Sequence, residues 1–316
     1  MAWRRSSSPR RPGRTPSTCS SFPTPASKPP LKLADPDVIR GITRRFQIRY
    51  QRKWGQNFLA DQAALERLVD ALELADGERI VEVGPGLGVL TVELAQRAAQ
   101  VVGIEIDPNC VHALELTLRG LGNVRIIEGD VLRTPIGEVI EPPYRVIGNI
   151  PYNLTGALMV HLLEQRRTAS RIDLVVQKEV AERLAAPAGS WSLATLGVRV
   201  YGRPEILMTL PPDAFVPPPQ VASALLRIVP DARPALPPDQ LPAFFRFVTP
   251  FFQARRKQLA FAMARGLGVP NAEARARLAV IGIDPARRAE TLGLDEWKRL
   301  FEEERTNWRL DTIQAR

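Results

Sequence analysis

The sequence is poor in cysteine and histidine, and it contains no long apolar run. Of its 316 residues, two are cysteines (Cys19 and Cys110) and two are histidines (His112 and His161). The cysteines lie far apart in the sequence, which argues against a disulfide framework. Neither histidine has other metal-ligating residues near it in the sequence, which argues against a metal site. No apolar run could cross a bilayer, so we expect a soluble protein without a membrane partner, and we expect it to be a monomer.

Acidic side chains are missing from the N-terminal part of the chain. Residues 1–34 carry seven basic side chains and no acidic one, and residues 40–53 add six basic side chains, again without an acid. Residues 54–316 hold 30 basic and 32 acidic residues, so the net charge of +9 comes from the N-terminal part. Aromatic side chains interleave with the arginines of residues 40–53, and we expect this segment to contact RNA.

Residues 1–34 are rich in proline, serine and arginine, and they lack the apolar segment of a secretory signal. Their acid-free composition is similar to that of an organelle transit peptide, but the prolines argue against the amphipathic helix that such a peptide needs. We therefore expect a disordered tail and a bacterial cytoplasmic protein. A mitochondrial or other organelle location is the alternative.

Helical and strand patterns alternate from Gln56 onward. Residues 61–74 have apolar positions at helical spacing, with Asp61 as the expected N-cap, and apolar strand patterns and further helices follow as far as residue 177. This alternation predicts an α/β domain with a mostly parallel sheet, which binds ligands at the carboxyl ends of its strands. Helical patterns alone follow Pro230. We expect a basic extension at 1–39, the α/β domain at 40–230 and a helical domain at 231–316.

Three successive strand ends carry groups that suit an adenosine ligand. The first strand ends in the glycine turn of residues 84–88, which departs from the dinucleotide fingerprint because Val89 stands where the third glycine belongs. The next two strands end in Glu105, which could hold ribose hydroxyls, and Asp130, which could accept a hydrogen bond from adenine. Each feature alone could be structural. Together they indicate adenosine without a pyrophosphate, hence S-adenosylmethionine and methyl transfer.

Eight motifs occur in order along the chain: KWGQNFLAD (53–61), VEVGPGLG (81–88), GIEID (103–107), EGD (128–130), GNIPYNL (148–154), LVVQKEVAERL (174–184), DAFVPPPQVASALLRI (213–228) and FFQARRKQL (251–259). Through these motifs the sequence resembles the ribosomal RNA adenine N6,N6-dimethyltransferases over roughly residues 50–300. This resemblance implies a Rossmann-like methyltransferase domain followed by a small helical domain that binds RNA. It further implies dimethylation of two adjacent adenosines in a hairpin near the 3′ end of small-subunit (16S) ribosomal RNA, late in assembly of the small ribosomal subunit.

The resemblance also implies roles for single residues. The segment that closes over the methionine end of the cofactor would contribute two contacts, the glycine turn one, and the ends of three further strands the rest. The cofactor-binding residues implied in this way are Asn57, Leu59, Gly84, Glu105, Asp130 and Asn149.

Residues 149–152 would form the catalytic segment, although none of their side chains is a general base. The Asn149 side-chain carbonyl and the Ile150 backbone carbonyl can accept the two N6 hydrogens of adenine, which turns the nitrogen lone pair toward the methyl group. Pro151 fixes the backbone, and Tyr152 offers a face on which a flipped base can stack. The alternative is that these residues only lead the chain from a strand into a turn and take no part in catalysis.

Several residues outside this segment are candidates for RNA contact. The resemblance places Phe215 near the target base, with packing at the domain junction as the alternative. Arg255, Arg256 and Lys257 are candidates for phosphate binding, with a solvated helix face as the alternative. Residues 191–193 replace a tyrosine-glycine-arginine run that is common in the family, which puts a contact of this loop with the substrate in doubt.

Two other functions stay open. One is a large-subunit ribosomal RNA adenine methylase of the macrolide-resistance type. The other is a nucleic-acid-binding factor of the kind that includes organelle transcription factors derived from this family. The presence of Gly84, Glu105, Asp130 and Asn149 together argues against a protein that has lost its activity.

Overall fold

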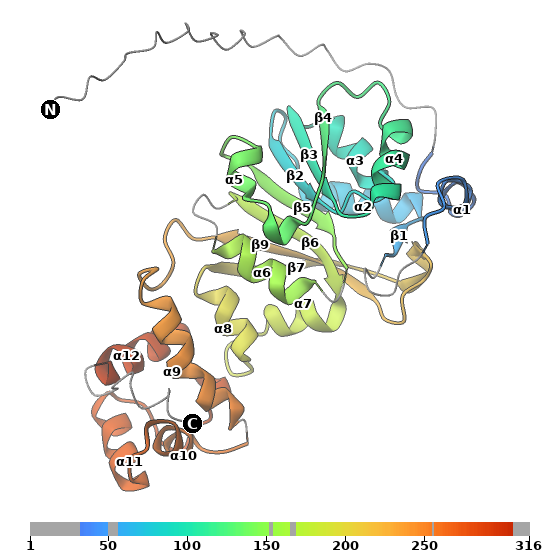
Figure 1. Cartoon of the computed structure of the whole chain (residues 1–316). Helices are drawn as coiled ribbons and strands as arrows, with labels where there is room; N and C mark the ends of the chain where they lie inside the picture. The colour runs from blue at the N-terminus through green and yellow to red at the C-terminus, as the bar shows by residue number, and fades with distance from the viewer. Residues whose placement is uncertain (1–31, 50–55, 152–153, 165–168, 255, 306–316) are drawn as a thin grey trace, which may run out of the picture.

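The structure, a computed structural model, describes residues 32–49, 56–151, 154–164, 169–254 and 256–305 (Figure 1). A seven-stranded sheet in the order β4-β3-β2-β5-β6-β9-β7 forms its centre. The first five strands in this order are parallel to one another. At one edge, β9 pairs antiparallel with β6, and β7 pairs antiparallel with β9. The strands are β2 (Arg79–Val83), β3 (Gln100–Glu105), β4 (Val124–Glu128), β5 (Arg145–Asn149), β6 (Arg171–Gln177), β7 (Gly202–Leu210) and β9 (Ser223–Pro230).

Helices cover both faces of the sheet, as the apolar strand patterns predict. Successive strand residues enter opposite cores: Ile80 belongs to the core that includes residues of α2, α3 and α4, whereas Val81 belongs to the core that includes residues of α5, α6, α7 and α8. The predicted Asp61 N-cap is present, because its side chain accepts from the Ala64 backbone N–H at 2.8 Å. The helices are α2 (Gln62–Leu72), α3 (Val89–Ala95), α4 (Pro108–Thr117), α5 (Ile136–Val139), α6 (Thr155–Leu163), α7 (Lys178–Leu184) and α8 (Leu193–Arg199), with the 3-10 turn η2 (Val131–Arg133).

The predicted boundary between residues 39 and 40 is wrong, because helix α1 (Pro36–Arg45) crosses it. The Asp35 side chain caps this helix by accepting from the backbone N–H groups of Asp37 and Val38. Ile39 and Ile42, three residues apart on one helix face, are buried in the core that also holds α2. The α/β domain therefore begins before residue 40. Residues 1–31, and residues 50–53 of the predicted RNA-contacting segment, lie outside the described residues.

A small second sheet lies beside the carboxyl ends of the central strands. It pairs β1 (Phe58–Leu59) with β8 (Phe215–Val216) in antiparallel fashion, so that Leu59 is opposite Phe215. The short turn η3 (Pro212–Ala214) leads into β8, and the Ala60 N–H donates to the Ala214 carbonyl at 2.8 Å. Segments that lie more than 150 residues apart in the chain thus form one wall over the sheet edge.

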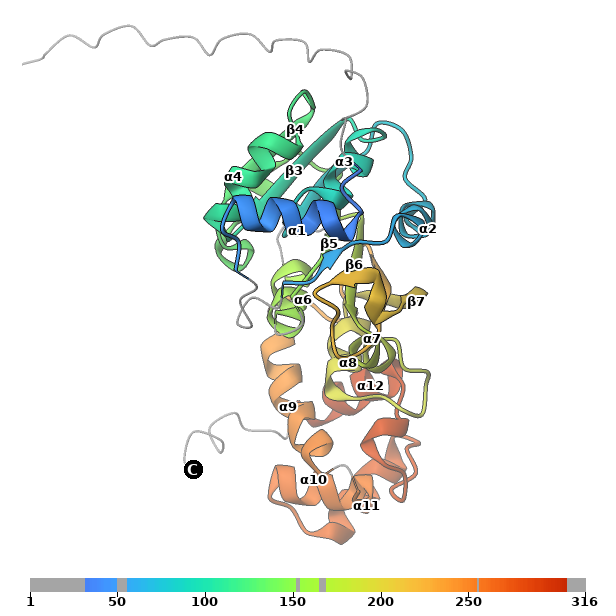
Figure 2. The same ribbon diagram turned by 90° about the vertical axis from the view of Figure 1, so that its right-hand side faces the viewer.

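Helices alone follow β9 in the described part of the chain (Figure 2). They pack around an aromatic cluster that includes Phe247, Phe251, Trp297 and Phe301. In both views these helices lie at the end of the molecule remote from α1. Their bounds are α9 (Leu241–Gln253), α10 (Leu259–Leu267), α11 (Asn271–Val280) and α12 (Leu294–Glu304), with the 3-10 turn η4 (Ala289–Thr291). None of the described helices is long and apolar enough to span a membrane.

Residues 191–193, where the sequence departs from the family pattern, connect the two parts of the molecule. The buried Trp191 donates its backbone N–H to the Glu290 carbonyl at 3.0 Å, which joins the loop before α8 to η4. Ser192 caps α8 through a reciprocal bond pair with Thr195. These residues therefore pack the domain junction in this protein.

A buried ion-pair network lies across β5, β6 and β9. The Asp173 carboxylate accepts from Arg145 Nη2 at 2.7 Å and from Arg227 Nε at 2.6 Å, and all three side chains are buried. Both arginines also donate to the Leu72 carbonyl at the end of α2. The network satisfies charges that would otherwise be costly to bury and joins α2 to the sheet.

Candidate active site

A pocket opens at the carboxyl ends of β2, β3 and β5, where the sequence predicts ligand binding. Its cavity measures about 230 Å³, far above the roughly 10–15 Å³ by which a cavity holds one water. It therefore has room for an organic ligand. The lining includes every cofactor residue predicted from the sequence, together with Phe215 and two residues of the catalytic segment: Asn57, Leu59, Gly84, Glu105, Asp130, Asn149, Ile150, Pro151 and Phe215.

The glycine turn brings the backbone close to the cavity. Gly84, Gly86 and Gly88 have φ angles of 65°, 58° and 83°, a region that side chains other than glycine rarely adopt. At Gly86 a Cβ would also lie 2.9 Å from Phe58 Cε1, on the wall made by β1. The turn thus lets Phe58 pack directly on the loop, and α3 begins immediately after it at Val89.

Glu105 is held in place by the same turn. One of its carboxylate oxygens accepts from the Gly86 N–H and the other from the Asp107 N–H, both at 2.9 Å. Burial raises the pKa of this carboxyl, and these two backbone bonds oppose the rise. The side chain is therefore fixed at the end of β3, where an acid suits ribose hydroxyls.

Asp130 is half-buried and lines the cavity just beyond the end of β4. Its Oδ1 accepts from the Leu132 N–H at 3.0 Å and so caps η2, which is a structural role for this strand end. A carboxylate offers about four acceptor positions, so capping leaves capacity for an adenine amino group. Both interpretations are compatible with the position of Asp130 in the pocket lining.

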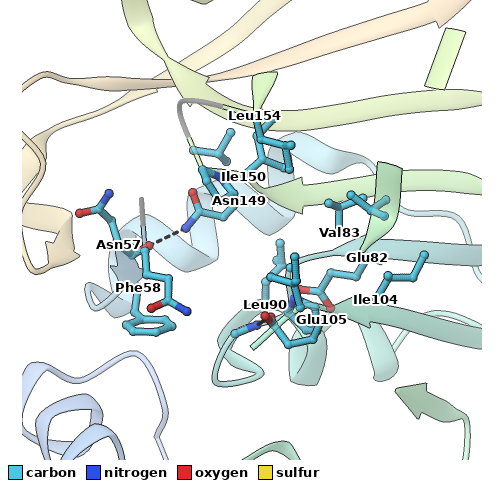
Figure 3. Close-up of a pocket in the computed structure, with 18 of the residues that line it drawn as sticks. Asn57, Phe58, Glu82, Val83, Leu90, Ile104, Glu105, Asn149, Ile150 and Leu154 are labelled. Carbon is cyan, nitrogen blue, oxygen red and sulfur yellow. Dashed lines mark hydrogen bonds between the residues drawn. The ribbon is translucent and has the colours of Figure 1, made fainter. Parts of the chain in front are cut away.

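Asn149, the last residue of β5, is oriented by the segment before β1 (Figure 3). Its Nδ2 donates to the Asn57 carbonyl at 2.8 Å. A carbonyl can only accept a hydrogen bond, so the amide must turn its NH2 group toward Asn57. This bond therefore directs the acceptor Oδ1 away from the Asn57 carbonyl. The Ile150 N–H donates to the Val175 carbonyl at 3.3 Å and the Pro151 carbonyl accepts from Leu154 at 3.0 Å, which sets the backbone path after the strand.

Glu82 is a pocket residue that the sequence interpretation missed. It lies on β2 with a side chain that is 2% exposed, and its Oε2 has no hydrogen-bond partner in the described part of the chain. Burial raises the pKa of this carboxyl to about 8, the nearby Thr91 hydroxyl opposes the rise, and Glu105 adds to it. The available signal was an acid inside the otherwise apolar run of residues 80–83.

The basic candidates of the helical domain do not lie in this pocket. Arg256 and Lys257 are exposed between α9 and α10, and Lys257 Nζ lies 5.5 Å from the centre of the Phe261 ring. Two predicted residues, Tyr152 and Arg255, lie outside the described residues. Phe215 is buried and lines the cavity from β8, opposite Leu59. Its contact with a target base stays a prediction.

The sequence of residues 47–305 matches the family described as ribosomal RNA adenine dimethylase. The chain belongs to the ribosomal RNA adenine dimethylase family. A curated member from Dehalococcoides mccartyi (strain BAV1), named Ribosomal RNA small subunit methyltransferase A, is 38% identical over 277 residues, covering 87% of this chain and 94% of that protein. As a family member, the protein is an S-adenosylmethionine-dependent ribosomal RNA adenine dimethyltransferase.

Two solved structures are also similar to this dimethylase. The 23S rRNA methyltransferase ErmE is 29% identical with a TM-score of 0.63, covering 78% of this chain and 99% of that one. A dimethyladenosine transferase from Plasmodium falciparum is 22% identical with a TM-score of 0.68, covering 79% and 98%. These likenesses agree with the predicted Rossmann-like methyltransferase fold with a helical C-terminal part.

The charged side chains that line the pocket of this dimethylase complement the charges of its cofactor. Three carboxyl side chains, those of Glu82, Glu105 and Asp130, line the cavity, and no basic side chain does so among the described residues. S-adenosylmethionine carries a sulfonium and an ammonium against one carboxylate, so a cavity lined by carboxyl groups favours it. The roles implied by the resemblance, Glu105 and Asp130 at the adenosine and Asn57 and Leu59 at the methionine end, stay predictions.

Proposed function

We propose that this enzyme dimethylates the N6 amino groups of two adjacent adenosines in a hairpin near the 3′ end of small-subunit (16S) ribosomal RNA. The orientation of Asn149 carries the proposal. Its amide is held by the Asn57 carbonyl at the edge of a pocket that fits S-adenosylmethionine, so its acceptor end is set before the target arrives. An exocyclic amino group is the kind of target that such a preset acceptor orients.

In the proposed mechanism the chain orients the nucleophile and supplies no base, so the proton that N6 loses on methylation passes to water. The bound cofactor contributes a methyl group that its sulfonium activates toward displacement. Asn149 Oδ1 and the Ile150 carbonyl accept the two N6 hydrogens, which directs the nitrogen lone pair out of the adenine plane. Pro151 lacks an N–H that would compete for these acceptors. We further propose that Tyr152 stacks on the flipped adenine.

The proposed substrate is an immature small ribosomal subunit, late in its assembly. Support comes from the curated relatives named Ribosomal RNA small subunit methyltransferase A, such as the one that is 38% identical and covered over 94% of its length. Exposed basic residues offer phosphate contacts: Arg44 and Arg45 on α1, and Arg256 and Lys257 between α9 and α10 of the helical domain. One group precedes the pocket residues in the sequence and the other follows them, and together they would hold an extended RNA.

A large-subunit methylase is the second candidate, because ErmE is 29% identical and similar in fold. Primer extension on ribosomal RNA from a strain lacking the gene separates the two. We expect stops at two adjacent adenosines near the 3′ end of small-subunit RNA in the parent strain, lost in the deletion strain and restored by the wild-type gene. Loss of a modification in large-subunit RNA instead would contradict the proposal.

The alternative of a binding factor without catalysis is opposed by the described pocket. Glu105 is held by two backbone N–H groups, and Asn149 by a third backbone group, in a cavity with room for the cofactor. This arrangement supports an enzyme over a factor that binds RNA alone, because it forms a cavity of the size that a cofactor needs. Equilibrium binding of S-adenosylmethionine to the purified protein tests this point directly.

A further inference from the structure

Trp191 joins the loop before α8 to the helical domain and is not among the residues that line the pocket. Its backbone N–H donates to the Glu290 carbonyl at η4 at 3.0 Å, and its side chain is 8% exposed. The Arg199 guanidinium of α8 lies 5.9 Å from the centre of the indole ring. The ring belongs to the buried cluster that continues into α9, and α8 itself packs against α9 (Figure 1). Trp191 is thus held from both sides of the domain junction.

A series of hydrogen bonds and chain connections leads from Trp191 to the catalytic segment. A capping box fixes the start of α8 immediately after Trp191. Within this box, Thr195 Oγ1 also donates to the Arg183 carbonyl near the end of α7 at 2.6 Å. Helix α7 directly continues β6, and the Val175 carbonyl on β6 accepts from the Ile150 N–H at 3.3 Å. The position of Trp191 is therefore tied to the residue whose carbonyl is proposed to orient adenine.

A second series leads from Trp191 to the basic residues of the helical domain. The 3-10 turn η4, which Trp191 holds, closely follows Arg287 in the chain. The Arg287 carbonyl accepts from the N–H of Leu259, the first residue of α10, at 2.6 Å. Arg256 and Lys257 are exposed in the turn just before α10, where phosphates can reach them. Trp191 therefore lies between the groups proposed to bind the RNA backbone and the groups proposed to orient the target.

We propose that Trp191 is a positioning residue, which sets the distance between the RNA phosphates held by the helical domain and the adenine held at Asn149. Phosphate contacts carry no sequence information, so they fix the register of the RNA without choosing an adenosine. With the RNA backbone held at the helical domain, the spacing across the junction decides which nucleotide reaches the pocket. The inference rests on the proposed function in taking RNA as the substrate and Arg256 and Lys257 as its phosphate contacts.

Truncation of the Trp191 ring should change this spacing and leave the pocket intact. A basic side chain can bind any phosphate, so the affinity for unmethylated small ribosomal subunits in filter binding should change by less than about threefold in Trp191→Ala. Catalysis depends far more on position, so kcat for methyl transfer to these subunits should fall about 10- to 100-fold. The affinity for S-adenosylmethionine should equal that of the wild type. Trp191→Phe, which keeps a ring at the junction, should restore most of the rate.

Ile80→Ala is the matched control for lost packing, because Ile80 is fully buried near the amino end of β2, away from the pocket. It should lower the midpoint of unfolding much as Trp191→Ala does and leave kcat unchanged. Equal loss of kcat in these two variants, or full kcat in Trp191→Ala, would overturn the inference. Trp191→Leu takes the place of Trp191→Ala where the alanine variant fails to fold, because it keeps apolar volume at the junction and removes the ring.

A double-mutant comparison tests whether Trp191 acts through the basic residues. In a protein that carries Arg256→Ala and Lys257→Ala, the RNA is no longer held at this turn, so the spacing should matter less. Adding Trp191→Ala to that protein should therefore lower kcat by less than about threefold. An undiminished loss would overturn the claim that Trp191 acts through these phosphate contacts. Absence of methyl transfer to small subunits by the wild-type protein would overturn the proposed function instead, so the two failures are distinguishable.

Discussion

Gly148 allows β5 to approach β2 closely just before Asn149. A Cβ at position 148 would lie 2.6 Å from the Val83 backbone oxygen and 3.1 Å from Val83 Cβ, whereas ordinary contacts begin at 3.4 Å. The nearer atom belongs to the backbone of a central strand, which cannot swing aside like a flexible side chain. The substitution Gly148→Ala should therefore push the end of β5 away from β2 by up to about 0.8 Å, the difference between the two distances.

This displacement falls one residue from Asn149, so it should act on catalysis. A misplacement of about 1 Å can cost roughly 100-fold in rate, and we expect Gly148→Ala to lower kcat/KM for methyl transfer by about 10- to 100-fold. Overpacking should also lower the free energy of unfolding by about 1–3 kcal/mol. The assay is transfer of labelled methyl groups to unmethylated small ribosomal subunits, with denaturant unfolding in parallel.

Gly156→Ala is the matched control, because Gly156 lies exposed in α6 and a Cβ there meets nothing within 4 Å. In a helix this change should stabilise the protein by about 0.5–1 kcal/mol and leave transfer unchanged. Equal kcat/KM for the two alanine variants would refute the reasoning. A Gly148→Ala protein that is destabilised but fully active would show that strand spacing does not position Asn149.

Three further perturbations have expected results. Asn149→Ala should reduce transfer about 100- to 1,000-fold, as loss of a preset polar group does, with RNA retention in filter binding largely kept; full transfer would contradict the role of Asn149. Asp173→Asn leaves Arg145 and Arg227 without their shared counter-charge and should lower the free energy of unfolding by about 3–5 kcal/mol in denaturant titrations; a loss below 1 kcal/mol would contradict this. Burial raises the pKa of the Glu82 carboxyl from 4.5, its ordinary value in an unfolded chain, to about 8 in the folded protein. The free energy of unfolding of the cofactor-free protein should therefore fall as pH rises from 5 to 8, by a few kcal/mol relative to Glu82→Gln. Curves of unfolding free energy against pH that run parallel for the two proteins would refute this.

The fold class and most of the pocket could be predicted from the sequence, because both follow from local patterns. Apolar strands separated by helices indicate a parallel sheet, and the carboxyl ends of parallel strands meet at one edge. Glu105, Asp130 and Asn149 each lie at the end of a strand, so their appearance in one cavity needs only the topology. Family motifs then connect these positions with methyl transfer.

Features that depend on contacts between distant segments could not be predicted. The bond from Asn149 to the Asn57 carbonyl joins residues 92 positions apart. The importance of Glu82 depends on its burial and on an oxygen without a partner in the described part of the chain, neither of which a strand pattern reveals. The sequence predicts a start of the α/β domain that is too late, because the basic composition of this segment conceals the two buried isoleucines of α1. Composition describes the exposed face of such a helix better than its buried face.

Mass spectrometry of ribosomal RNA after reaction with purified enzyme tests the central claim most directly. Unmethylated small ribosomal subunits would be incubated with S-adenosylmethionine and either wild-type protein or Asn149→Ala, with large subunits as a parallel substrate. We expect N6,N6-dimethyladenosine at two adjacent positions near the 3′ end of small-subunit RNA with wild-type protein and almost none with the variant. Dimethyladenosine in large-subunit RNA alone, or equal amounts with both proteins, would contradict the claim that Asn149 orients a small-subunit adenosine for methyl transfer.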